Sequence, residues 1–97
     1  WSSLGCYSDN VNGRALPNGE TVPGGSQSMT VELCQTACKS AGYTIAGLEY
    51  SQECWCGNSF VNGGAYVGAD GTSGCVMACK GNSKEVCGGS NRLGAWK

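Results

Sequence analysis

The sequence predicts a small disulfide-rich α+β domain in which one main helix packs on a short antiparallel sheet. Three observations support this fold class. The chain has 97 residues, which leaves room for one compact core, so we expect a single domain over residues 1–97. It has 8 cysteines, an even number typical of disulfide frameworks made in oxidising compartments. It also has one clear helical pattern between short strand-like segments and glycine-rich loops.

The charge composition excludes several classes of function. Six basic and seven acidic residues give a net charge of -1, whereas nucleic-acid or anionic-membrane surfaces need clustered Lys and Arg. The chain has no His, which removes Cys/His zinc sites and His-dependent nucleophile pairs. It also lacks a calcium loop of alternating acidic residues. We therefore expect no nucleic-acid partner, no metal and no cofactor.

The N-terminal third is predicted to contain one strand and a long loop. Residues 1–7 include Trp1, Leu4 and Cys6 and are expected to form the opening strand. The next segment, 8–28, is rich in Asn, Gly and Pro, which favour turns. We interpret it as an ordered loop held at Cys6.

A helix is predicted from Val31 to Ala41. Thr30 is a suitable N-cap, and Glu32 lies in the first turn, where the helix dipole favours a negative charge. Gly42 follows the last helical position, where glycine commonly ends a helix. Two cysteines lie four residues apart inside this segment and therefore share one face.

Residues 44–50 and 53–56 are predicted to form a β-hairpin around Ser51-Gln52. This pair is a poor two-residue turn, so the register is the weak part of the prediction. With that turn, the register sets three pairs opposite each other: Glu49 with Cys54, Gly47 with Cys56 and Leu48 with Trp55. Gly47 would then leave room for the helix to approach.

The C-terminal part is predicted to hold a loop, a short helix and a closing strand. Residues 57–74 are again rich in Gly and Asn. Ser73 could cap a helix of one or two turns that contains Cys75 and Cys79. A strand over 93–96 closes the chain.

The cysteine spacing predicts bridges between the helix and the hairpin. Cys34 and Cys38 are one helical turn apart, and Cys54 and Cys56 share one face of a strand, so the two pairs match in spacing. They can form two parallel bridges or the crossed pair. Zinc binding by two four-cysteine sites is the alternative, but the spacings lack the close C-x2-C pairs of such sites.

An ordered set of motifs spans the chain from Gly5 to Trp96. The set comprises Gly5-Cys6-Tyr7, Cys34-x3-Cys38, Gly47-Leu48-Glu49-Tyr50, Glu53-Cys54-Trp55-Cys56-Gly57-Asn58 and Cys75-x3-Cys79-x7-Cys87-Gly88-Gly89. Together these motifs resemble the WSC domain. The resemblance implies an α+β fold related to PAN/apple domains and four disulfides. The implied pairs are Cys6–Cys75, Cys34–Cys54, Cys38–Cys56 and Cys79–Cys87.

The resemblance also implies a location and a function. WSC domains occur in yeast cell-wall integrity sensors and as appendages on fungal glucanases and copper radical oxidases. We therefore expect a secreted or extracellular, cell-wall-associated module of a larger enzyme or sensor, and no membrane insertion by this segment. The implied partner is cell-wall polysaccharide, with β-1,3-glucan first and chitin or xylan as alternatives. The other hypothesis is a protein-interaction or self-associating ectodomain of a stress sensor.

Candidate carbohydrate-binding residues are those that offer an aromatic ring or a polar side chain to a sugar: Trp55, Tyr66, Tyr50, Asn58 and Asp70. Trp55 must point away from the cysteine face of its strand, with Leu48 and Tyr50 as expected neighbours. It then forms either a stacking platform or part of a second small core. Asn58 could instead hold a turn.

Catalysis is not expected. Glycoside hydrolysis needs two carboxyl groups flanking a cleft, and Glu49, Glu53 and Asp70 were the candidates. In the predicted register Glu49 lies on the disulfide face and Glu53 near a turn. We also expect Arg14 and Asp9 to form an ion pair within the loop, which carries little weight for function.

Overall fold

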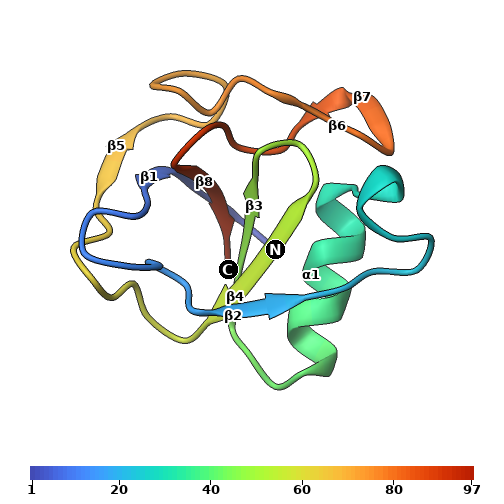
Figure 1. Ribbon diagram of the computed structural model, residues 1–97, viewed down its shortest axis with the longest axis horizontal. Helices are drawn as coiled ribbons and strands as arrows, with labels where there is room; N and C mark the ends of the chain where they lie inside the picture. The colour runs from blue at the N-terminus through green and yellow to red at the C-terminus, as the bar shows by residue number, and fades with distance from the viewer.

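The computed structural model describes all residues 1–97 and consists of one helix against a sheet, with the α+β disulfide-rich fold that the sequence predicts (Figure 1). The elements are β1 (Ser3–Ser8), β2 (Asn18–Glu20), the 3-10 helix η1 (Ser26–Ser28), α1 (Val31–Ser40), β3 (Ile45–Glu49), β4 (Glu53–Gly57), β5 (Tyr66–Gly68), β6 (Ala78–Cys79), β7 (Asn82–Val86) and β8 (Arg92–Trp96). Neither helix has the length and apolar composition needed to cross a membrane.

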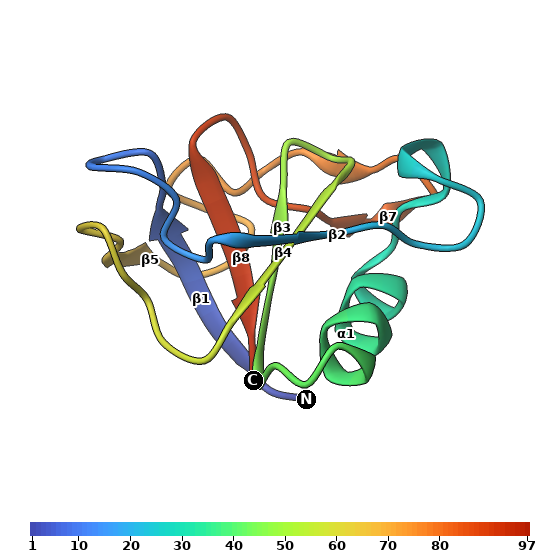
Figure 2. The same ribbon diagram turned by 60° about the horizontal axis from the view of Figure 1, so that its bottom comes forward.

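Six strands form one antiparallel sheet in the order β2-β4-β3-β8-β1-β5, and β6 and β7 form a separate two-stranded ribbon. Figure 2 shows α1 to one side of the β3–β4 hairpin, with β2 crossing beside β4. β2 and β5 lie within segments predicted as loops. They are three-residue edge strands, too short to leave a pattern of alternating side chains in the sequence.

The helix begins and ends where its capping residues predict. The Thr30 side chain accepts a hydrogen bond from the backbone N–H of Leu33 at 3.1 Å, which satisfies one of the free donors of the first turn. Gly42 follows the helix with φ +92°, a conformation that glycine adopts without a steric penalty. Four residues of α1 turn towards the sheet and are buried: Val31, Cys34, Gln35 and Cys38.

The hairpin exists, but its predicted register is wrong by one residue. Glu49 lies opposite Glu53, Leu48 opposite Cys54 and Gly47 opposite Trp55. The loop has three residues, 50–52, because Tyr50 and Ser51 both adopt positive φ in place of the two-residue turn that Ser51-Gln52 would have made poorly. The shift turns every side chain of β3 to the other face from the one predicted.

The shift also corrects the role assigned to Gly47. A Cβ on Gly47 would lie 2.8 Å from both Leu16 Cδ1 and Leu93 Cδ2, so this glycine faces the sheet surface opposite α1. The missing side chain of Gly47 leaves space for Leu16 in the loop after β1, and not for α1. Glu49 is on that same surface and not on the disulfide face.

Four disulfides join the elements in the pairs that the WSC resemblance implies. Cys34–Cys54 and Cys38–Cys56 are the parallel version of the helix-to-strand bridges, each with a Cα–Cα distance of 5.4 Å. The three sulfurs of Cys34, Cys38 and Cys54 lie within 4.8 Å of one another, but each is consumed in a disulfide and offers no thiolate to a metal.

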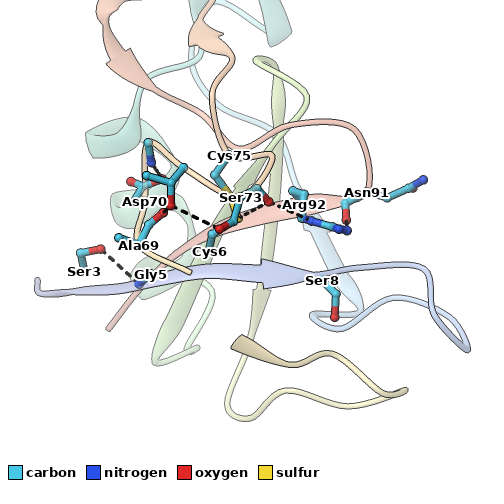
Figure 3. The surroundings of a disulfide bond; sticks show 12 residues. Ser3, Gly5, Cys6, Ser8, Ala69, Asp70, Ser73, Cys75, Asn91 and Arg92 are labelled. Atoms are coloured by element: carbon cyan, nitrogen blue, oxygen red, sulfur yellow. Dashed lines mark hydrogen bonds between the residues drawn. A yellow bond between two sulfur atoms is a disulfide. The ribbon is translucent and has the colours of Figure 1, made fainter. Parts of the chain in front are cut away.

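The predicted helix around Cys75 and Cys79 is wrong. Residue 77 instead exchanges backbone hydrogen bonds with residues 87 and 88, so this segment is extended and continues into β6. The Cys6–Cys75 bridge fixes it to β1 (Figure 3), and the Arg92 Nε–H donates to the Ser73 carbonyl at 3.1 Å. Backbone hydrogen bonds from residue 77 to residues 87 and 88 stabilise this extended conformation more than a Ser73 cap would stabilise a short helix.

Each face of the sheet carries its own buried cluster. The larger cluster lies between α1 and the sheet and includes Leu48, Met29 and six of the eight cysteines. The smaller cluster lies on the opposite face and consists of Ala15, Leu16, Ile45 and Leu93, with Trp55 and Phe60 packed against it. The loops after β1 and β4 therefore cover part of the face that carries Trp55.

Candidate functional site

Arg14 is the centre of the densest polar cluster on the face opposite α1. Its Nη1 lies 2.8 Å from Asp9 Oδ2, 3.3 Å from Glu49 Oε2 and 3.8 Å from Glu53 Oε1. Its guanidinium carbon lies 4.1 Å from the centroid of the Trp55 ring. We call these five residues the Arg14 cluster. The expected Arg14–Asp9 pair is present, and the structure adds two acids and a ring to it.

The fold brings the cluster together from three segments. Asp9 and Arg14 belong to the loop after β1, where the Ala15 N–H donates to Asp9 Oδ1 at 2.7 Å and closes the loop. Glu49 and Glu53 are directly opposite each other at the end of the β3–β4 hairpin. Trp55 follows on the same face of β4, and its indole N–H donates to Glu53 Oε1 at 3.0 Å.

Asp9 and Glu49 are buried acids that both contact Arg14. Burial, followed by hydrogen bonding to Asp9 and by the charge of Asp9, raises the pKa of Glu49 from its ordinary 4.5 to about 9. Burial alone would raise the pKa of Asp9, but hydrogen bonds with Glu49 and with the Ala15 backbone outweigh burial and lower it. At neutral pH Glu49 is therefore a neutral carboxylic acid and Asp9 is ionised.

Trp55 belongs to the second small core, which is one of the two possible roles that the sequence left open. Its ring is partly buried, packs against the smaller cluster and has Arg14 over one face. Gly19 of β2 lies beside it, because a Cβ there would be 3.3 Å from Trp55 Cζ3. Leu48, the neighbour expected from the wrong register, lies on the helix face instead. The indole thus lies at the edge of the smaller buried cluster and remains partly exposed to solvent.

Tyr50 lies at the tip of the hairpin, beside the Arg14 cluster. Its side chain is 48% exposed, and its backbone φ is +52°. It lines a shallow pocket that we call the hairpin-tip pocket, together with Asn10, Arg14, Glu49, Glu53, Ser90 and Asn91. The structure therefore brings Trp55 and Tyr50 to the same region, with Arg14 and Glu53 between them.

Tyr66 is in a different part of this face. Its side chain is 60% exposed and meets Tyr7 edge to face, with ring centroids 5.9 Å apart. Tyr7 in turn stacks on Phe60 at 3.9 Å, so Phe60 anchors the loop after β4. The Tyr66 ring also lies over Gly5, where a Cβ would be 2.6 Å from it.

Asn58 and Asp70 are apart from both aromatic groups. Asn58 Oδ1 accepts hydrogen bonds from the backbone N–H and the hydroxyl of Thr44, at 3.0 and 3.1 Å, so it holds the start of β3. Asp70 lines a separate pocket with Glu32, Glu85 and Trp96. Burial raises the pKa of Asp70. The five candidates thus occupy four places.

Comparison with known proteins identifies the family. The WSC domain model matches residues 3–89. The chain belongs to the WSC domain family. A WSC domain-containing protein of Arthroderma benhamiae is 46% identical over 97 residues, which is 100% of this chain and 10% of that protein.

WSC domains similar to this one also occur in animal proteins. The xylosyltransferase oxt of Drosophila pseudoobscura pseudoobscura is 37% identical over 87 residues, covering 90% of this chain and 9% of that protein. Kremen protein 2 of Homo sapiens is 34% identical over 96 residues, covering 97% of this chain and 19% of that protein. The chain spans at most a fifth of the length of these three relatives, so a WSC domain is one part of each.

The Arg14 cluster was missed by sequence reasoning for a definite reason. Arg14 and Asp9 were recognised as a pair, but the shifted register put Glu49 on the wrong face and removed it from their neighbourhood. The turn sequence Tyr50-Ser51-Gln52 has no glycine or asparagine to select its length, so the register was left open. A three-residue turn places Glu49 opposite Glu53 and next to Trp55.

Proposed function

We propose that this WSC domain is a non-catalytic carbohydrate-binding module that holds a larger secreted protein against cell-wall polysaccharide, with β-1,3-glucan first. The observation that carries the proposal is the hairpin end, where two partly exposed aromatic side chains, Trp55 and Tyr50, flank a set of charged and amide groups. Sugars need both a ring for their C–H faces and fixed hydrogen-bond partners for their hydroxyls.

The geometry of the acids supports binding and not hydrolysis. Asp9 and Glu49 contact the same Arg14 Nη1 at 2.8 and 3.3 Å, so the two acids do not flank a cleft that could hold a glycosidic bond. A shallow site with few rings should bind a single chain weakly, and several modules on one protein would bind more tightly through avidity.

The test is depletion from solution by insoluble polysaccharides. The domain is mixed with insoluble β-1,3-glucan, chitin, xylan and cellulose, and the protein left in the supernatant is measured. Removal by β-1,3-glucan above the level of cellulose is expected. No removal by any of the four would contradict the proposal.

A second function is supported by a separate observation. Apolar side chains are exposed on two loops that hydrogen-bond to each other through Asn12 and Asn62, and on one face of the edge strand β5: Val11, Val61 and Tyr66. Such a patch fits a protein partner or a second copy of the domain. Sedimentation at micromolar concentration would then show dimers or clusters that soluble oligosaccharides do not dissociate.

A further inference from the structure

The hairpin-tip pocket is formed where three segments meet. Its volume is about 340 Å³, and it is lined by the loop after β1, the β3–β4 turn and the loop before β8. The Asn10 side chain donates to Asn91 Oδ1 at 2.8 Å, and the Asp9 N–H donates to the Asn91 carbonyl, so the two outer loops are fixed to each other. The pocket is therefore a built feature of the fold.

The floor of the pocket contains a buried polar atom without a partner. Glu49 is 3% exposed, and its Oε1 has no hydrogen-bond partner, although its Oε2 accepts from Arg14. A buried oxygen in this condition destabilises the fold unless a group from solution satisfies it. An occupant that offers a hydroxyl to this oxygen would remove that destabilisation.

Arg14 offers unused donors in the same place. All three of its acidic contacts use Nη1, and no hydrogen bond within the protein uses Nη2 or Nε. Glu53 uses Oε1 for the Trp55 indole and has a second oxygen available. The pocket therefore offers both free donors and free acceptors, which suits groups that both donate and accept.

The charge balance argues against an ionic occupant. Asp9 and Glu53 would repel an anion, and Arg14 would repel a cation from the same space. Because burial keeps Glu49 protonated at neutral pH, the acids do not outnumber the base by more than one charge. A neutral polyhydroxyl compound is the chemical class that this arrangement fits.

Tyr50 supplies the apolar part of the site. A bulky residue seldom adopts φ +52°, and here that conformation places a 48% exposed ring at the rim of the pocket. A sugar ring seated with its hydroxyls towards Arg14 would present C–H groups to this ring.

We propose that the hairpin-tip pocket is a subsite for two neighbouring hydroxyl groups of a neutral sugar residue, bound by Arg14, Glu49 and Glu53 and covered by the Tyr50 ring. The inference rests on the proposed function and names the site through which it acts. Trp55 does not line this pocket, but it holds Arg14 and Glu53 in position from the side.

The experiment compares two substitutions in the β3–β4 turn and adds a third at Arg14. Tyr50→Gly removes the ring and suits the positive φ, so it should weaken binding about tenfold or more without lowering the melting temperature. Ser51→Gly relieves the same kind of backbone conformation at φ +68° but removes no pocket side chain, so it should bind as the unchanged chain does. Arg14→Lys keeps the charge, loses the forked donors and should also weaken binding about tenfold.

Binding is measured by depletion on the polysaccharide that retains the unchanged domain, and by titration with soluble β-1,3-gluco-oligosaccharide. If Tyr50→Gly and Arg14→Lys both bind with the same affinity as the unchanged domain, the subsite is overturned and the proposed function still stands. Failure of the unchanged domain to bind any polysaccharide would overturn both. Tighter binding of glucosamine or galacturonic acid oligomers than of neutral oligomers would also overturn the subsite, since it would show an ionic site.

Discussion

Gly47 of β3 and Leu16 of the loop after β1 are in direct contact across the face opposite α1. A Cβ on Gly47 would lie 2.8 Å from Leu16 Cδ1, closer than carbon atoms approach in folded proteins. The loop that carries Asp9 and Arg14 therefore rests on the sheet through a glycine. The position of the Arg14 cluster depends on this close packing.

Gly47→Ala should destabilise the domain by roughly 1–3 kcal/mol, because the added methyl group overpacks the site between Leu16 and Leu93. Urea unfolding measures the change. Combining it with Leu16→Ala tests the cause, since the smaller side chain gives the methyl group space. The loss in the double variant should be smaller than the sum of the two single losses, and a simple sum would contradict the packing account.

The disulfides should differ in what they contribute to stability. Cys6–Cys75 closes a sequence separation of 69 residues and Cys79–Cys87 one of 8. In the chain-entropy model their removal costs about 4 and about 2.5 kcal/mol respectively. Paired Cys→Ala variants, compared by their urea midpoints, should show the larger loss for Cys6–Cys75. Equal losses would mean that native packing, and not the unfolded chain, determines the contribution.

The helix and its bridges could be predicted because their signals are local. Thr30 and Gly42 mark the ends of α1, and the spacing of Cys34 and Cys38 matches that of the cysteines on β4. The false helix at Cys75 shows the limit of such signals. Its cap at Ser73 is local too, but the backbone of Met77 pairs with residues 87 and 88, and no local pattern reports that pairing.

The candidate site was predicted less completely because it depends on register and on long-range contact. Trp55 and Tyr50 do meet the same polar region, whereas Tyr66, Asn58 and Asp70 lie elsewhere. A single extra residue in the hairpin turn decides which face Glu49 occupies. Short turns without a strong glycine or asparagine signal leave that choice open in the sequence.

The N-cap of α1 offers a matched pair of substitutions. Thr30→Ala removes the acceptor of the Leu33 N–H and should cost about 1 kcal/mol of unfolding free energy. Thr36→Ala makes the same chemical change at an exposed position within α1, where alanine is the better helix former, and should cost nothing. Equal effects in urea unfolding would show that capping is not what stabilises this end of the helix.

The stability of the domain should fall as pH rises through the neutral range. Glu49 has its pKa raised from the ordinary 4.5 to about 9 in the folded chain, so between these values the folded state holds a proton that the unfolded state has lost. One proton corresponds to a slope of up to about 1.4 kcal/mol per pH unit. Asp9 acts in the opposite sense, because its lowered pKa gives stability that is lost below about pH 4.

Glu49→Gln isolates this effect, because the amide resembles the protonated acid and does not titrate. Asp70 and Glu85 also have raised pKa values, so both proteins keep the part of the pH dependence that comes from them. Urea unfolding at pH 5, 6, 7 and 8 should show the unchanged domain losing stability faster than the variant does. The charged groups that act on Glu49 are Asp9, Arg14 and Glu53, and all three are unchanged in the variant. Parallel curves for the two proteins would mean that the pKa of Glu49 is not raised in the folded state.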